Sequence, residues 1–251
     1  MEFLTPELIL ILLTVAFVSG CVDAIAGGGG LITVPALLLA GLPPAAALGT
    51  NKLQAVFGTL TAVINFNRKG HVNIKPMALE IALTFAGAAL GALTVQSMDP
   101  GVLLKLIPIA MLGIALYFGF SPNIGDIESH QRISKLTFAT TVGFGIGFYD
   151  GFLGPGTGSF FVLAYVGLLG LNLLRATAHT KVLNLTSNTG GLVLFVIGGN
   201  VVWTLGLLMA VTQVAGGYVG SHLAIKHGGK LIRPLIVISA IAASAKLLLD
   251  S

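Results

Sequence analysis

Long apolar stretches alternate with short polar ones along almost the whole chain. They run over 4–26, 31–42, 46–66, 77–97, 102–120, 135–153, 158–174, 178–198, 201–224 and 231–249. Most are about 20 residues long, which is the length that a helix needs to cross a bilayer. The second and seventh are shorter, and each follows a glycine-rich break of the kind that interrupts helices. The pattern predicts helices throughout, with these two forming half crossings or arms of re-entrant hairpins.

Composition indicates which solvent these helices face. The chain is 55% hydrophobic and only 9% charged, with a mean hydropathy of +0.96, whereas a soluble domain carries about 25% charged residues. A chain this apolar cannot cover a water-facing surface, so we expect an all-α polytopic membrane protein surrounded by the lipid bilayer. In such a protein the net charge of +4 marks cytoplasmic loops rather than a nucleic-acid partner.

Two residues near the N-terminus narrow the class further. Cys21 is the single cysteine, which excludes an internal disulfide and an all-cysteine metal site. The first apolar stretch is followed by Asp23 rather than by a small-residue cleavage site. We therefore interpret this stretch as a retained helix and not as a signal peptide.

One motif occurs twice in the chain. Segment 20–30, in which Asp23 precedes a glycine run, returns 127 residues later as segment 147–157, and a polar triplet ending in lysine follows each copy. Further matches keep an offset of 127 to 129 residues, which chance similarity between apolar stretches does not produce. We interpret this as an internal duplication, with an N-terminal membrane repeat over 1–120, a polar connecting loop over 121–134 and a C-terminal membrane repeat over 135–251.

Loop charges predict that the second repeat is inverted in the membrane. Each repeat has an odd number of elements, so the second starts on the opposite side. If every element crosses, most basic side chains fall on one side, which the positive-inside rule makes cytoplasmic. Both termini then lie on the outer, periplasmic face of a bacterial inner (plasma) membrane. The basic residues on the cytoplasmic side are Arg68, Lys69, Lys75, Arg132, Lys135, Arg175, Lys226, Lys230 and Arg233.

The glycine-rich breaks predict an anion site between the repeats. Each break opens a helix, and a helix start carries unsatisfied N–H groups and about half a positive charge. Glycine lets an anion approach that backbone closely. The alternative is close packing of helices, which we favour for the glycine pairs Gly87–Gly91 and Gly216–Gly220. The predicted anion-binding residues of the breaks are Gly28, Gly29, Gly30, Gly156, Thr157 and Gly158.

Polar residues at the start of the third element of each repeat extend this candidate site. Asn184 and Asn188 lie three and seven residues after Lys181, so the three share one face of an otherwise apolar helix. The alternative for the lysines is snorkelling to the membrane interface. The predicted binding residues in these elements are Asn51, Lys52, Thr180, Lys181, Asn184 and Asn188.

The two aspartates have two readings. Asp23 or Asp150 could carry a proton as the coupling ion, since an acid in hydrocarbon is expensive and usually functional. Alternatively each carboxylate satisfies backbone N–H groups freed by the broken helix, the reading that we favour. His179 has no second histidine or cysteine at ligand spacing, so we predict no metal site and no cofactor.

The paired motifs resemble those of the TauE/SafE (TSUP-type) family of bacterial membrane permeases. The resemblance is carried by Asp23–Leu37 and Ala47–Gln54, and in the second half by Gly147–Pro155 and Ala178–Lys181, which resemble the YfcA-like branch in particular. It implies an inner-membrane transporter with duplicated halves. It also implies a small sulfur-containing anion, such as sulfite or an organosulfonate, that is often exported.

Both lines of reasoning predict a secondary transporter for a small anion, not an enzyme. The chain lacks the glycine-rich loop of ATP-driven pumps, so transport would proceed by alternating access at a site between the repeats. The alternatives are a passive anion channel, a scaffold and a membrane-embedded aspartyl enzyme with no catalytic residue that we can name. The oligomeric state is open, and a homodimer is one candidate.

Overall fold

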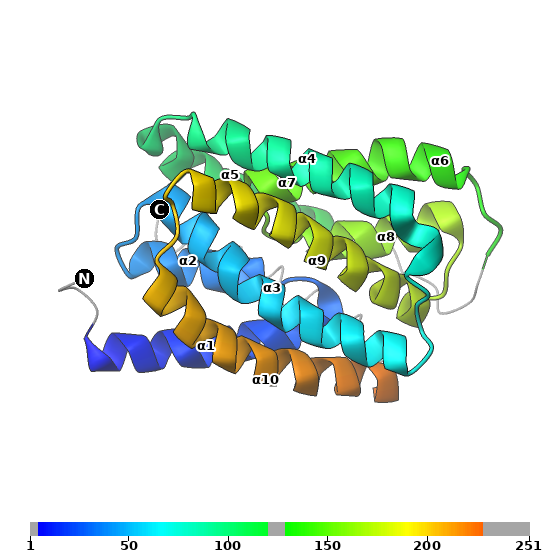
Figure 1. Cartoon of the computed structure of the whole chain (residues 1–251), viewed down its shortest axis with the longest axis horizontal. Coiled ribbons are helices and arrows are strands. Elements are labelled where there is room, and N and C mark those ends of the chain that lie inside the picture. The colour runs from blue at the N-terminus through cyan, green and yellow to red at the C-terminus, as the bar shows by residue number, and fades with distance from the viewer. Residues whose placement is uncertain (1–4, 120–128, 228–251) are drawn as a thin grey trace.

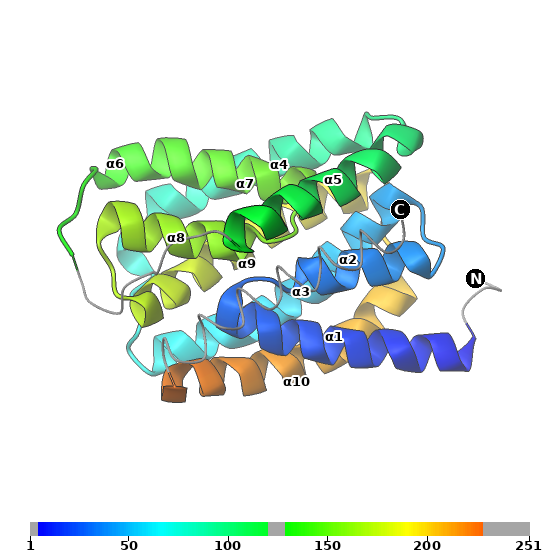
Figure 2. The same ribbon diagram turned by 180° about the vertical axis from the view of Figure 1, so that it is seen from behind.

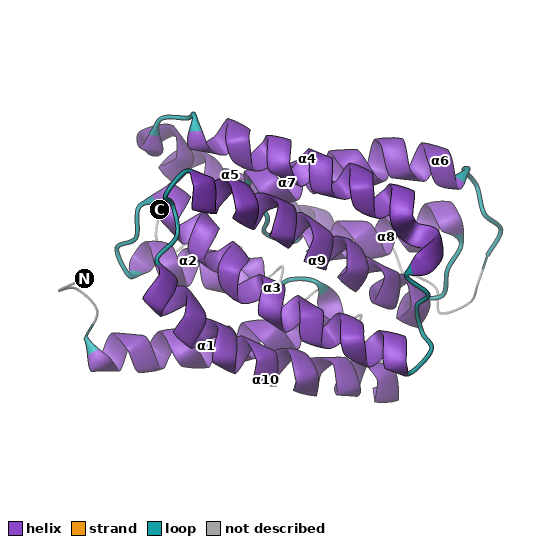
Figure 3. Cartoon of the chain, viewed as in Figure 1, coloured by secondary structure: helices purple, strands orange, loops and turns teal. Residues whose placement is uncertain are grey.

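The computed structural model describes residues 5–119 and 129–227, and all regular structure in these ranges is helical (Figure 3). This confirms the all-α fold class. The predicted stretch 231–249 and most of the connecting loop lie outside the described residues. The elements are α1 (Pro6–Ala26), α2 (Gly30–Leu39), α3 (Pro44–Arg68), the 3-10 turn η1 (Lys75–Met77), α4 (Ala78–Gln96), α5 (Pro100–Gly119), α6 (Lys135–Phe138), the π-helical turn η2 (Ala139–Gly143), α7 (Phe144–Phe152), α8 (Thr157–Leu169), α9 (Leu173–Ile197) and α10 (Trp203–His227).

Helix boundaries follow from local chemistry. The Thr5 hydroxyl accepts the Leu8 N–H and so caps the start of α1, just before a proline that suits the first helical turn. Asn172 caps α9 in the same way by accepting the Arg175 N–H. At its other end α1 stops at Gly27, which has a φ of 76°, a left-handed conformation that favours glycine.

Length and surface character fit a membrane protein. Helix α1 and the segment Lys75–Gln96 are each long and apolar enough to cross a bilayer. Helices α2 and α8 have only 10 and 13 residues, so they reach about 15 Å and about 20 Å and cannot span a hydrocarbon core of about 30 Å. Large apolar side chains such as Leu10, Ile109 and Val211 are exposed on the outside, where lipid tails would cover them.

The helices of the two halves pack in crossed pairs. Helix α1 lies along α10 and α4 lies along α7, while α3 and α9 contact each other between these pairs (Figures 1 and 2). A Cβ on Gly91 would lie 2.1 Å from the carbonyl oxygen of Phe148, and one on Gly220 would lie 2.4 Å from that of Cys21. These glycines therefore serve close helix packing, as predicted.

The backbone has the same shape at equivalent places in both halves. Helices end in left-handed glycines at positions separated by the offset of the duplication, and the contacts of Gly91 and Gly220 above are likewise equivalent. The two halves thus contribute matching surfaces to each other. The inverted orientation in the membrane stays a prediction. The paired left-handed glycines are Gly27 with Gly154, Gly41 with Gly170 and Gly70 with Gly199.

Apolar packing fills the bundle in two clusters. The larger runs through the helices of both halves and includes Phe66, Phe138 and Phe195. The smaller, which we name the apolar end cluster, lies where α2 joins α3 and α9 joins α10, and its members are Leu12, Ala16, Leu37, Ala40, Leu42, Ala47, Leu205 and Met209. The polar residues of the predicted site lie between this cluster and the opposite end of the bundle.

Candidate substrate site

Two helix breaks, one from each half, meet inside the bundle. A Cβ on Gly27 would lie only 2.4 Å from the Cα atom of Gly158, so the two breaks touch backbone to backbone. A Cβ on Gly30 would lie 3.3 Å from the Cα atom of Pro155. The close approach explains why residues without side chains occupy these positions.

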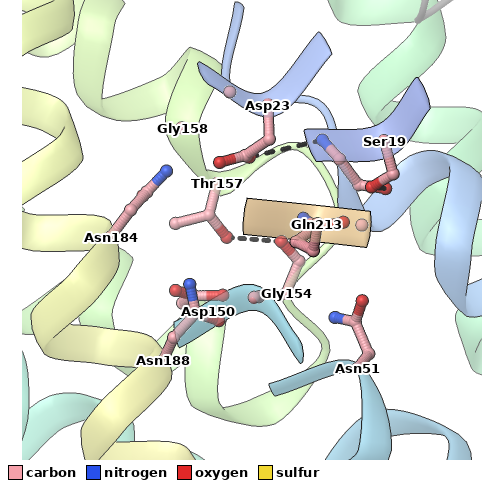
Figure 4. Close-up of a pocket in the computed structure, with 14 residues that line it drawn as sticks. Ser19, Asp23, Asn51, Asp150, Gly154, Thr157, Gly158, Asn184, Asn188 and Gln213 are labelled. Carbon is pink, nitrogen blue, oxygen red and sulfur yellow. Dashed lines mark hydrogen bonds between the residues drawn. The ribbon is translucent and has the colours of Figure 1, made fainter. Parts of the chain in front are cut away.

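A cavity of about 360 Å³ lies beside the two breaks (Figure 4). Helices α1, α3 and α10 supply one part of its wall, and the break before α8 together with α7 and α9 supplies the other. The lining residues are Ser19, Asp23, Gly27, Gly29, Gly30, Asn51, Ala55, Asp150, Gly154, Thr157, Gly158, Asn184, Asn188 and Gln213. Segments far apart in the chain therefore build one polar chamber.

Most of the predicted binding residues lie in this wall, and some do not. Gly29, Gly30, Asn51, Thr157, Gly158, Asn184 and Asn188 line the cavity. Both aspartates line it as well. The predicted residues outside the wall are Gly28, Lys52, Gly156, Thr180 and Lys181.

The lysines lie behind the wall because each pairs with an aspartate of the other half. Lys52 Nζ lies 2.5 Å from Asp150 Oδ1, and Lys181 Nζ lies 3.3 Å from Asp23 Oδ2. The two lysines are 1% and 0% exposed, which excludes the snorkelling alternative for both. An unpaired buried charge would be strongly destabilising, so each pair ties one half to the other.

The aspartates differ in what they satisfy. Asp23 Oδ1 accepts the Gly29 N–H at 3.4 Å, which is the bracing of a broken backbone that the sequence predicts. Asp150 instead gives one oxygen to Lys52 and the other to the Ser187 hydroxyl. For Asp150 the expectation of a backbone brace therefore does not match the structure, since side chains occupy both of its oxygens.

Asn51 presents a hydrogen-bond donor to the cavity. Its Oδ1 atom accepts from Thr33 Oγ1 at 2.5 Å and from Gln54 Nε2 at 3.2 Å. Because the oxygen is occupied, the Nδ2 group is left for the cavity, and Figure 4 shows it turned towards the middle. The helix starts add further donors, since neither Gly29 before α2 nor Gly156 before α8 has a side-chain cap.

Two lining residues were missed by sequence reasoning. Ser19 donates to the Gly29 carbonyl at 2.9 Å and so fastens α1 to the break. Gln213 is 2% exposed, and its Oε1 atom has no hydrogen-bond partner. Gln213 could have been noticed as a strongly polar residue inside an apolar stretch, whereas a serine on a membrane helix is too common to stand out.

The described residues offer no metal centre. Within 5–119 and 129–227, no three side chains among histidine, cysteine, aspartate and glutamate lie close enough to hold a metal ion. His179 pairs its Nδ1 atom with the Arg175 carbonyl at 2.8 Å and packs on the ring of Tyr165. The chemistry of the cavity is therefore that of amides, hydroxyls, backbone N–H groups and two ion pairs.

Comparison with known proteins gives a consistent picture. A family model described as "Sulfite exporter TauE/SafE" matches residues 12–247. The chain is 50% identical to the probable membrane transporter protein YfcA of Escherichia coli K12, over 98% of this chain and 92% of that protein. It is 49% identical to the probable membrane transporter protein ORF9 of a Sinorhizobium species, over 100% and 96%.

A more distant relative is similar over nearly the same length. The probable membrane transporter protein MJ0441 of Methanocaldococcus jannaschii is 27% identical, over 94% of each chain. No solved structure matches the chain.

Proposed function

The chain belongs to the TauE/SafE family of membrane transporters, and we propose that it is a secondary transporter that binds a small anion in the cavity between the two helix breaks. Relatives are named as transporters and not as enzymes. The proposal therefore concerns the substrate, its site and the way in which it crosses the membrane.

The orientation of Asn51 is the observation that carries the anion proposal. Its oxygen is held by Thr33 and Gln54, so it offers N–H groups and not an acceptor to the cavity. Uncapped helix starts face the same space, and their N–H groups and dipoles favour negative charge. A small oxyanion needs several converging donors of this kind.

The buried lysines supply the positive charge that an anion requires. Lys52 and Lys181 stand directly behind Asp150 and Asp23, which line the cavity. Thr180 lies beside Lys181 in the chain and is 0% exposed. We propose that Lys52, Thr180 and Lys181 act on the substrate from this second layer, while Gly28 and Gly156 contribute the backbone of the helix starts.

Transport would proceed by alternating access around this fixed site. Each ion pair joins a residue of one half to a residue of the other, so movement between the halves passes through these contacts. We propose a sulfur-containing oxyanion or an organosulfonate as the substrate, export as the direction and a proton as the coupling ion. The protein would lie in a bacterial inner membrane with both termini outside.

An anion screen tests the proposal. Purified protein is heated with sulfite, sulfate, thiosulfate, methanesulfonate and small carboxylates, and we expect the bound anion to raise the unfolding temperature. Asn51→Asp replaces the donor with a second acceptor and should weaken binding about tenfold or more, since a hydrogen bond to a charged group contributes about 1.5–3 kcal/mol.

Asn65 provides the matched control for that variant. It lies on the same helix, but its amide bonds to Ser221 and His222 away from the cavity. Asn65→Asp should leave anion affinity unchanged. Equal loss of affinity in both variants would remove Asn51 from the site.

A passive anion channel is the second candidate, because a polar chamber between helices could also conduct. The two are separated by reconstituting the protein into vesicles. Accumulation of the anion against its own gradient, driven by a second ion, requires a transporter. Flux that only relaxes the anion gradient would favour the channel.

A further inference from the structure

The two buried ion pairs occupy equivalent places in the duplicated chain. Lys52 and Lys181 are related by an offset of 129 residues, and Asp23 and Asp150 by 127. Each lysine reaches across to the aspartate of the other half. Differences between the pairs therefore reflect what each half has acquired since duplication.

The pair Lys52–Asp150 is closed on all sides. Its nitrogen and oxygen are 2.5 Å apart, and the two side chains are 2% and 4% exposed. The second oxygen of Asp150 accepts the Ser187 hydroxyl. Both carboxylate oxygens are thus saturated by short hydrogen bonds from inside the protein.

The pair Lys181–Asp23 is looser and faces the cavity. Its nitrogen and carboxylate oxygen are 3.3 Å apart, and the Asp23 side chain is 15% exposed. Lys181 also donates to the backbone carbonyl of Asp23, so the lysine stays anchored if the carboxylate leaves. The other Asp23 oxygen has only the Gly29 N–H at 3.4 Å.

One residue explains much of this difference. Ser187, which saturates Asp150, corresponds through the offset of 129 to Gly58, which has no side chain to offer. A Cβ on Gly58 would lie 2.5 Å from the Cγ atom of Gln213, so a serine there would collide with the cavity wall. The first half thus leaves Asp23 without the hydroxyl that holds Asp150.

We propose that Asp23 is the exchangeable counter-ion of this transporter: an entering anion displaces its carboxylate from Lys181, while Lys52–Asp150 stays closed as a structural pair. This deepens the proposed function and rests on it. Asp23 lines the cavity and Lys181 lies behind it, so an anion that replaces the carboxylate meets the ammonium group directly.

The exchange carries a proton with the anion. A displaced carboxylate that stays ionised inside the membrane would be strongly unfavourable, so Asp23 takes up one proton from the side to which the cavity is open. Lys181 remains an ammonium group, and the monovalent anion takes over the charge of the carboxylate. The net charge of the site is the same before and after, and anion and proton move together.

The surroundings of Asp23 fit this role. Asn184 lies three residues after Lys181 and shares its face of α9. In Figure 4 the Asn184 amide nitrogen and the Asp23 carboxylate lie on the same side of the cavity, next to Gly158 near the start of α8. The charged groups around Asp23 are Lys181 on α9 and, acting on that lysine, Asp150 on α7.

The experiment compares equivalent variants of the two pairs, with methanesulfonate as the probe because its charge is constant near neutral pH. Binding to the wild type should weaken about tenfold for each pH unit between about pH 6 and about pH 8, since one proton accompanies one anion. Asp23→Asn mimics the protonated acid, so it should bind more tightly than wild type at the upper pH and lose the pH dependence. Lys181→Met should lose binding.

The other pair is the matched control. Asp150→Asn should keep the wild-type pH dependence, and Ser187→Ala serves the same purpose if Asp150→Asn does not fold. Wild-type pH dependence in Asp23→Asn, or its loss in the Asp150 or Ser187 variant, would overturn the proposal while leaving anion transport intact. A wild type that binds none of the screened anions would overturn both.

Discussion

The two ends of the bundle are held together by different interactions. At the end where α3 leads into α4, Tyr165 donates a hydrogen bond of 2.5 Å to Glu80, and both side chains are buried. At the opposite end the positions related by duplication are Met209 and Leu38. Met209 belongs to the apolar end cluster and Leu38 packs against that cluster. Equivalent positions thus carry a directional contact at one end and a non-directional one at the other.

The difference teaches how a duplicated scaffold can become asymmetric. The Tyr165 ring also packs on Phe138 and His179 at centroid distances of 4.7 Å and 5.4 Å, so the hydrogen bond forms only in one arrangement of the rings. Apolar side chains such as Met209 lose less when they shift, because dispersion contacts are many and weak. We therefore expect the polar end to be sensitive to geometry and the apolar end to be sensitive to volume.

Met209→Ala should have the largest effect on stability. Met209 is 0% exposed, so truncation leaves a cavity in the apolar end cluster and should cost about 2–5 kcal/mol. The measurement is the unfolding temperature of the purified protein in detergent. Leu208→Ala is the control, since Leu208 is 42% exposed towards the lipid side. Similar losses in both variants would contradict the role given to the cluster.

Glu80→Ala should have the next largest effect, because it leaves the buried Tyr165 hydroxyl without an acceptor. An unsatisfied buried polar group costs about 1–3 kcal/mol. Glu80→Gln keeps an acceptor and should lose less. A double-mutant cycle of Glu80→Gln with Tyr165→Phe should give a coupling energy of about 0.5–3 kcal/mol. Additive losses would mean that the hydrogen bond contributes nothing to holding this end.

Much of the fold was predictable, because apolar length and glycine position are local signals. The break at Gly27 and the short helices α2 and α8 follow directly from them. Aspartates before the breaks and lysines after them were also visible in the sequence. Their pairing was not, since Lys52 and Asp150 are 98 residues apart and Lys181 and Asp23 are 158 apart.

The polar end was invisible for a related reason. Glu80 lies near the start of an apolar stretch, where an acid is an ordinary interfacial residue, and nothing local indicates that a tyrosine 85 residues later bonds to it. The same holds for Ser187, whose hydroxyl matters only because α9 places it against Asp150. Contacts between helices depend on rotation and register, which hydrophobic length does not encode.

The double variant Glu80→Met with Tyr165→Phe should have the smallest effect, although it removes the whole polar contact. It gives this end the apolar character of the other end, with a methionine where Met209 is the equivalent. Removing both partners of a buried hydrogen bond and keeping their shapes is nearly neutral, so we expect a change within about 1 kcal/mol. Lys135, whose charge acts on Glu80, is exposed and keeps its water. If the double variant is as unstable as Glu80→Ala, the polar contact holds this end in a way that packing cannot replace, and the two ends are not interchangeable.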